Sequence, residues 1–142
     1  MFRGLAFDMK LADVKQSETV RPDVEYEDYL RYRLFADSIA SGESVDMEYF
    51  FNKNNQLDLM IAFYNLADED DLHPLADELR RYFERSYGRA RLDEQGWYHW
   101  QFDDKKGESG SIEVNLVGET EKGYMGVEIE MIKYYENEER LR

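Results

Sequence analysis

Two segments, 111–117 and 124–135, contain runs in which apolar and polar residues alternate, and this pattern limits what the chain can fold into. The apolar positions are Ile112, Val114, Leu116, Val127, Ile129 and Met131. The acidic positions of the opposite parity are Glu113, Glu128 and Glu130. Successive strand residues point to opposite faces of a sheet, so each segment predicts a strand with one buried face. Residues 118–123 between them predict a hairpin, which places the three glutamates on one side of one sheet.

A third strand is predicted over residues 97–102, in the sequence WYHWQF. Strand alternation sends Trp97 and His99 to one face and Tyr98 and Trp100 to the other. If the sheet is covered on one side only, two of these large aromatics remain beside the glutamates. Aromatic residues are typical anchors of protein interfaces, so Tyr98 and Trp100 join the candidate partner-binding residues.

The earlier part of the chain predicts one more strand and several helices. Alternating apolar residues predict a strand over 5–11, and acidic residues before an apolar stripe predict a helix over 24–40. A short helix is expected over 46–51. Residues 57–64 favour a helix, although a buried strand stays open. The clearest helix follows Pro74, which suits a first turn, and ends at Gly88.

These elements predict an α+β fold in a single domain, 1–142. Its antiparallel sheet would contain the strand near the start of the chain and the three-stranded meander at its end, with about three helices packed on one face. Residues 136–142 are expected to be a frayed tail.

The overall charge excludes some partners and favours others. The chain has 32 acidic and 18 basic residues, a formal net charge of −14, and no cysteine. Such a field repels bare nucleic acid and anionic membranes and favours basic proteins. The absence of cysteine excludes disulfides, thiolate catalysis and cysteine-based zinc sites. No apolar segment suits a signal peptide or a membrane span, so a cytoplasmic location is expected.

An acidic run, Asp68, Glu69, Asp70 and Asp71, precedes the clearest helix. A calcium loop counted from Asp68 would need glycine at its sixth position and a carboxylate at its twelfth, but the chain has His73 and Leu79 there. No metal or other cofactor is therefore expected. Asp70 and Asp71 are predicted to cap the helix. The surplus acidic residues are assigned to a solvated loop or to a partner-binding surface.

A group of arginines, which we call the arginine cluster, follows within the same helix and just beyond it. Its members are Arg80, Arg81, Arg85, Arg89 and Arg91. One interpretation is that these guanidinium groups pair with the chain's own carboxylates, as Asp77 with Arg81 and Arg80 with Glu84 at helical spacing. The other is an anion-binding site.

The pattern of charge and aromatic residues favours a binding protein over an enzyme. The leading hypothesis is an acidic, non-enzymatic inhibitor that docks on a basic, nucleic-acid-handling partner, most specifically an immunity protein against a bacterial toxin. A DNA-mimicking protein of the anti-restriction type is the first alternative. The second is a small-molecule-binding or enzymatic domain whose pocket is lined by the arginine cluster, His99, Trp97 and Tyr82. The oligomeric state is left open.

Overall fold

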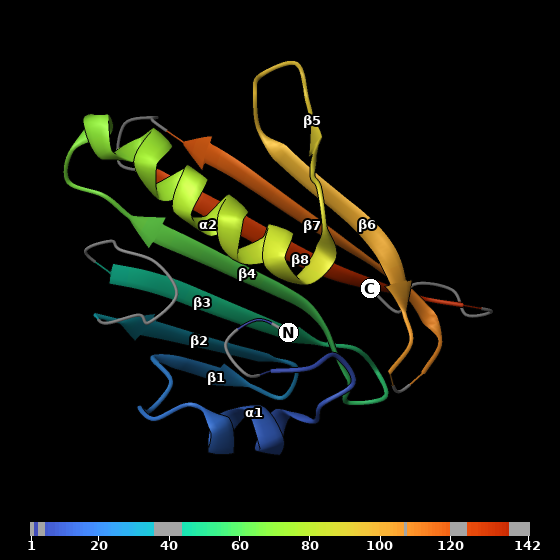
Figure 1. Cartoon of the computed structure of the whole chain (residues 1–142). Helices are drawn as coiled ribbons and strands as arrows, with labels where there is room; N and C mark the ends of the chain where they lie inside the picture. The colour runs from blue at the N-terminus through green and yellow to red at the C-terminus, as the bar shows by residue number, and fades with distance from the viewer. Residues whose placement is uncertain (1, 3–4, 36–43, 107, 120–124, 137–142) are drawn as a thin grey trace.

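The computed structural model describes residues 2, 5–35, 44–106, 108–119 and 125–136. Their main feature is one eight-stranded antiparallel sheet, in the order β1-β2-β3-β4-β8-β7-β6-β5 (Figure 1). The strands are β1 Val24–Tyr26, β2 Tyr29–Leu34, β3 Ser44–Phe51, β4 Leu57–Asn65, β5 Arg91–Leu92, β6 Tyr98–Asp104, β7 Gly110–Glu119 and β8 Gly126–Tyr135. The last strand pairs with both β4 and β7, so it joins two four-stranded meanders into one sheet.

Helix α2, Leu72–Tyr87, covers one side of this sheet and defines its inner face (Figure 1). It packs on β6, β7 and β8. Leu79 and Phe83 of α2 are fully buried, and the Phe83 ring lies 5.5 Å from that of Trp100. Phe2 stacks on Phe83 from the other side at 5.6 Å. The core is therefore a single apolar layer between the inner face, α2 and the beginning of the chain.

Two shorter helical elements complete the described residues. Helix α1, Leu11–Ser17, lies beside the β1 edge, and the 3₁₀ helix η1, Glu69–Asp71, leads directly into α2. None of these helices is long and apolar enough to cross a membrane, as far as the described residues show.

The antiparallel sheet is as predicted, but the predicted fold of four strands and about three helices is wrong. Residues 5–10 form a turn-containing segment rather than a strand. The helix predicted over 24–40 is the β1–β2 hairpin, its last residues, 36–40, lying outside the described part. The helices predicted over 46–51 and 57–64 are β3 and β4, and the latter matches the alternative left open. Most of the predicted tail, 137–142, also lies outside the described residues.

The C-terminal half agrees with the sequence prediction more closely. Helix α2 spans the expected residues, and β6, β7 and β8 form the expected antiparallel meander. The predicted hairpin at 118–123 falls largely outside the described residues, but the pairing of Glu119 with Gly126 fixes its register. The alternation on both strands predicts the face that each residue occupies, but it does not predict which residues pair across the hairpin.

Candidate functional site

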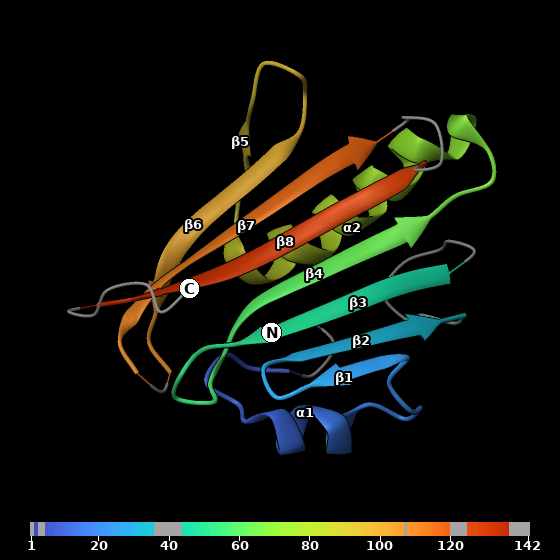
Figure 2. The same ribbon diagram turned by 180° about the vertical axis from the view of Figure 1, so that it is seen from behind.

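The outer face of the sheet, opposite α2, is the surface that stands out among the described residues. No described helix lies over β2, β3, β4, β8 and β7 on this side (Figure 2). The side chains that point outward from these strands include an apolar group in mid-sheet, which we call the outer apolar patch. Its members are Tyr29, Phe50, Leu59, Ile61, Phe63, Val117 and Ile132. All are only partly buried, so a contiguous apolar patch faces solvent, as at many protein interaction sites.

The three glutamates predicted to share a face do so, and they lie on the outer face. Asn115 pairs with Glu130 across the β7–β8 ladder, and Val117 pairs with Glu128. Glu113 has the same parity as Asn115, so it points the same way. Together with Asp46, Glu48 and Glu119 they make six outward carboxylates on β3, β7 and β8. Only two arginines of β2, Arg31 and Arg33, point outward with them, for a formal charge of −4.

A concavity of about 550 Å³, which we call the hollow, lies on the outer face over β2, β3, β4 and β8. Its apolar floor includes Ile61 and Phe63. Its charged walls are Arg31, Arg33, Asp46, Glu48, Glu119 and Glu128. Four carboxylates against two guanidinium groups leave it negative, so it offers both apolar contact and attraction for a cation.

Glu128 is the least compensated carboxylate of this hollow. Burial raises its pKa, and the nearby carboxylates of Glu130, Glu119 and Glu48 raise it further. Among the described residues, none donates a hydrogen bond to it. Its ionised form is therefore disfavoured by its surroundings, and a positive group placed beside it would stabilise that form.

Two other carboxylates of the hollow, Asp46 and Glu48, already have partners. The Arg33 guanidinium contacts Asp46 at 2.6 and 2.9 Å. Burial opposes ionisation of Asp46, but the hydrogen bonds from Arg33 and Asn65 lower its pKa overall. The Tyr29 hydroxyl donates to Glu48 at 2.5 Å, and burial and this hydrogen bond together raise the pKa of Tyr29. Glu128 is thus the carboxylate of the hollow whose ionisation its surroundings oppose.

A chain of polar contacts fixes Glu130 at the border of the outer face. His99 Nε2 lies 2.8 Å from Asp93 Oδ2, and His99 Nδ1 lies 2.7 Å from Asn115 Oδ1. The Asn115 amide then donates to Glu130 at 3.3 Å. The hydrogen bond from His99 lowers the pKa of Asp93. His99 therefore holds the β5–β6 turn onto the meander, and its partner is Asp93 in that turn.

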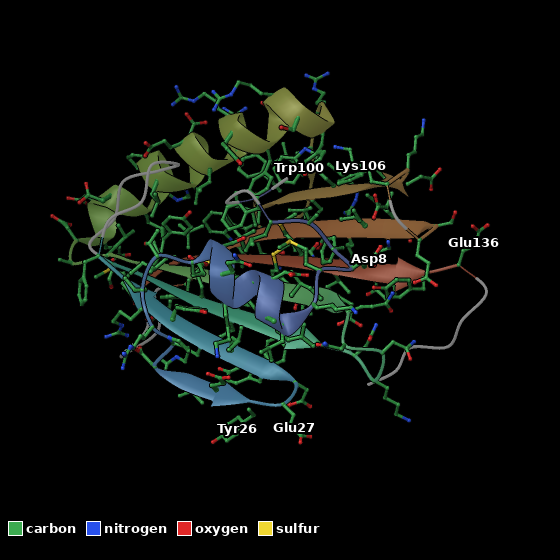
Figure 3. All side chains as sticks on the ribbon, turned by 90° about the horizontal axis from the view of Figure 1, so that it is seen from below. Asp8, Tyr26, Glu27, Trp100, Lys106 and Glu136 are labelled. Carbon is green, nitrogen blue, oxygen red and sulfur yellow. The ribbon has the colours of Figure 1, made fainter. Side chains whose placement is uncertain are left out.

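The two predicted aromatic anchors do not lie beside the glutamates. Tyr98 and Trp100 have the parity opposite to His99, as predicted, but that parity is the inner face. Trp100 is 4% exposed, donates its indole N–H to the Gly88 carbonyl at 2.9 Å, and lies beneath α2 (Figure 3). Tyr98 lies under the Arg80 guanidinium. Their exposure was predicted because the sequence does not show which face α2 covers.

Trp97 departs from the predicted parity because it precedes β6, which begins at Tyr98. Its ring sits over Gly118 and stacks on the His73 ring, with 5.4 Å between the ring centroids. It therefore lies at the start of α2 and away from His99. Neither the hollow nor the second cavity described below is lined by Trp97, His99, Tyr82 or the arginine cluster.

The acidic run lies at one end of the molecule, in the turn between β4 and α2. Asp68, Glu69, Asp70 and Asp71 are all exposed. The capping role falls to Asp68, whose carboxylate accepts the Asp70 amide at 2.9 Å at the start of η1. Asp71 precedes α2 without a side-chain cap bond, so the prediction that Asp70 and Asp71 cap the helix is wrong. Because η1 leads directly into α2, the backbone amides that need a cap lie at the start of η1 rather than at the start of α2.

The arginine cluster is largely engaged with the protein's own side chains. Arg80 bridges Asp77 and Glu84 on the surface of α2, and Arg81 contacts Asp77 at 2.5 Å. Arg85 lies over the Tyr82 ring. Arg89 and Arg91 are exposed beyond the end of the helix. These contacts favour the interpretation of internal pairing for Arg80 and Arg81 over an anion site.

Sequence reasoning missed the part of the site contributed by β3 and β4. Asp46, Glu48, Ile61 and Phe63 all lie in the hollow, but their segments were predicted to be helical. One available signal was the strict alternation over 45–51, where Val45, Met47, Tyr49 and Phe51 are buried and Asp46 and Glu48 are not.

Among the described residues, no group of three or more histidine or carboxylate side chains is placed to hold a metal ion. Comparison with known proteins adds no assignment: no family model, no curated protein and no solved structure matches the chain.

Proposed function

We propose that this protein is an acidic binding protein that uses its outer face to dock on a basic partner protein. The observation that carries the proposal is Glu128, a half-buried carboxylate without a described cationic partner, set in an apolar hollow. A lysine or arginine of the partner would stabilise its ionised form, and Ile61 and Phe63 would pack against the aliphatic part of that side chain.

The most specific form of this proposal is an immunity protein that neutralises a bacterial nuclease toxin without catalysing a reaction. Nucleases present basic surfaces to their substrates, and an acidic inhibitor is steered onto such a surface, at up to ~10⁸–10⁹ M⁻¹s⁻¹ at low salt. The alternative of a DNA mimic is less well supported. The outer face mixes arginines and an apolar patch with its carboxylates, which suits a mixed protein interface better than imitation of regular phosphates.

The partner can be found by photocrosslinking in the native host. We would place p-benzoylphenylalanine at Val117 on the outer face, and in a control protein at Arg81 on the solvent side of α2, where the side chain is 62% exposed. The proposal expects a basic protein crosslinked from Val117 and absent from the Arg81 control. An acidic adduct, or equal adducts from both positions, would contradict docking by the outer face.

Association kinetics with the captured partner then test the role of the glutamates. The variant Glu113→Gln, Glu128→Gln, Glu130→Gln should associate roughly tenfold more slowly at low salt, with the difference shrinking as salt rises. The matched control, Asp68→Asn, Glu69→Gln, Asp70→Asn, removes the same charge from the β4–α2 turn and should change the rate much less. Equal slowing in both variants would show that only net charge matters and would reject the outer face as the contact surface.

A further inference from the structure

A second concavity lies on the inner side of the sheet, at the end where α2 stops. This cavity has a volume of about 390 Å³ and is bounded by the segment Leu5–Asp8, by Tyr87 at the end of α2, and by inward residues of the sheet. Small-molecule sites in proteins typically measure roughly 300–1,000 Å³, so the cavity has the right size for one. It does not share lining residues with the hollow of the outer face.

The cavity wall is predominantly apolar. Its main apolar lining residues are Leu5, Phe7, Met60, Phe102, Ile112 and Met131. The charged residues that line it or lie directly behind it are Asp8, Asp103, Asp104, Lys105, Lys106 and Lys133. Three carboxylates and three ammonium groups cancel, although the whole chain carries −14. The charges around this opening therefore nearly balance, so it does not select strongly for cations or anions by charge.

The polar side of the cavity is a hydrogen-bonded cluster around a buried lysine. Lys133 is fully buried, and its ammonium group donates to Asp8 at 2.9 Å, to Asp104 at 2.9 Å and to the Glu108 carbonyl at 2.5 Å. The Tyr135 hydroxyl donates to the other oxygen of Asp8 at 2.6 Å. Asp8 also holds a left-handed backbone conformation, with φ of 75°. Figure 3 shows Asp8 and Lys106 toward the same end of the sheet.

The left-handed backbone of Asp8 and the buried ion pair of Lys133 are both uncommon in proteins. Aspartate adopts positive φ more readily than most residues, and such conformations cluster at binding sites. Burial of an ion pair is also seldom favoured over apolar packing. Asp104 retains capacity to accept hydrogen bonds, since it accepts from Lys133 and from the Lys106 amide, and a carboxylate can take about four.

We propose that this cavity binds a small, uncharged and mostly apolar molecule that carries a hydrogen-bond donor. The apolar body lies between the Leu5–Asp8 segment and the inner face, against Met60 and Ile112. The donor faces the Asp104 carboxylate, which Lys133 holds in place. This inference is independent of docking by the outer face, because the two surfaces lie on opposite sides of the sheet.

The uncharged dye N-phenyl-1-naphthylamine, which has an aromatic body and one N–H donor, is a suitable probe. The full chain should bind it saturably, with a rise in fluorescence. The variant Ile112→Phe fills the cavity and should weaken binding by at least about tenfold, equivalent to ~1.4 kcal/mol. The variant Ile61→Lys, which disrupts the outer apolar patch, should bind the dye as the wild-type chain does. Absence of saturable binding, or loss of binding in Ile61→Lys alone, would overturn the proposal.

A measurement on the unmutated chain keeps the test valid if Ile112→Phe does not fold. Methionine methyl groups report position by NMR, and Met60 and Met131 line the cavity whereas Met47 lies in the core on β3. Addition of the dye should shift the Met60 and Met131 signals and leave that of Met47 in place. Shifts confined to other methionines would place the dye elsewhere and reject the cavity as its site.

Discussion

Asp8 shows how one residue can link a local conformation to the whole fold. It is far from β8 in sequence, but its carboxylate closes the cluster around Lys133 and Tyr135 and accepts the Glu108 amide at 3.1 Å. Its backbone N–H donates to the Leu57 carbonyl at the start of β4. The left-handed conformation turns the chain so that both contacts form. The sequence pattern of 5–11 shows none of this, because the apolar alternation there resembles that of a strand.

Two substitutions at Asp8 separate backbone strain from the lost ion pair. Asp8→Ala and Asp8→Gly both remove the carboxylate beside buried Lys133 and should lower the free energy of unfolding by about 3 kcal/mol or more. Glycine adopts φ of 75° without strain, a gain of ~1–2 kcal/mol that exceeds its entropic cost of ~0.5–1 kcal/mol. Urea unfolding should therefore find Asp8→Gly more stable than Asp8→Ala by about 0.5–1 kcal/mol. An alanine variant of equal or greater stability would show that the backbone is unstrained.

At the scale of elements, the capping residue between β4 and α2 is Asp68, which caps η1, rather than Asp70 or Asp71 at the start of α2. Asp68 is the residue whose carboxylate satisfies a free amide, and η1 then continues into α2. Asp68→Ala should lower the free energy of unfolding by ~1 kcal/mol, the usual loss on removing a helix cap. Asp71→Ala is the matched control, since it removes the same charge without a cap bond. Thermal or urea unfolding that finds the two variants equal would contradict the assigned cap.

The elements that could be predicted from the sequence are those with one clear period. Helix α2 and strands β7 and β8 have a single apolar stripe or face, and the expected shared face of Glu113, Glu128 and Glu130 followed from parity alone. Strand β4 is apolar on both faces, because Ile61 and Phe63 point outward while Ala62 and Tyr64 point inward. The apolar residues of β4 therefore show no alternation, and their number and type did not decide between a helix and a strand.

The β1–β2 hairpin was missed for a different reason. Leu30 and Leu34 are four residues apart, a spacing that fits one helix face and one strand face equally well. Acidic residues before them resemble a helix start, but Glu27 and Asp28 occupy the hairpin turn. The extended conformation is stabilised by pairing of β2 with β1 on one side and with β3 on the other, and the apolar spacing alone does not show this pairing. The same error hid one wall of the hollow, since Tyr29, Arg31 and Arg33 lie on this hairpin.

For the molecule as a whole, the negative charge is arranged differently on its two sides. On the α2 side, Asp77 and Glu84 are paired with arginines of the same helix. On the outer face of β2, β3, β4, β7 and β8, six carboxylates meet two outward arginines, and Glu128 lacks a cationic partner among the described residues. The arrangement therefore concentrates uncompensated charge on the face that no described helix covers, which is the basis of the proposed docking surface.

The cost of this arrangement to the isolated protein can be measured through pH. Burial and neighbouring carboxylates raise the folded-state pKa of Glu128 above its ordinary value of 4.5. The folded state then binds this proton more tightly than the unfolded state, so ionised Glu128 lowers stability at neutral pH, and the penalty disappears as pH falls below 4.5. Glu128→Gln should therefore be more stable than the wild-type chain at pH 7, and this advantage should vanish below pH 4.5.

Urea unfolding midpoints measured at pH 7 and below pH 4.5 check this expectation, with Glu113→Gln as the matched control. That variant removes the same charge from the same face, where the carboxylate accepts a hydrogen bond from Tyr134 at 3.2 Å. It should lack the gain in stability at pH 7. If Glu128→Gln were no more stable than Glu113→Gln at pH 7, the outer face would already neutralise Glu128 internally, and a partner's cation would gain nothing by approaching it.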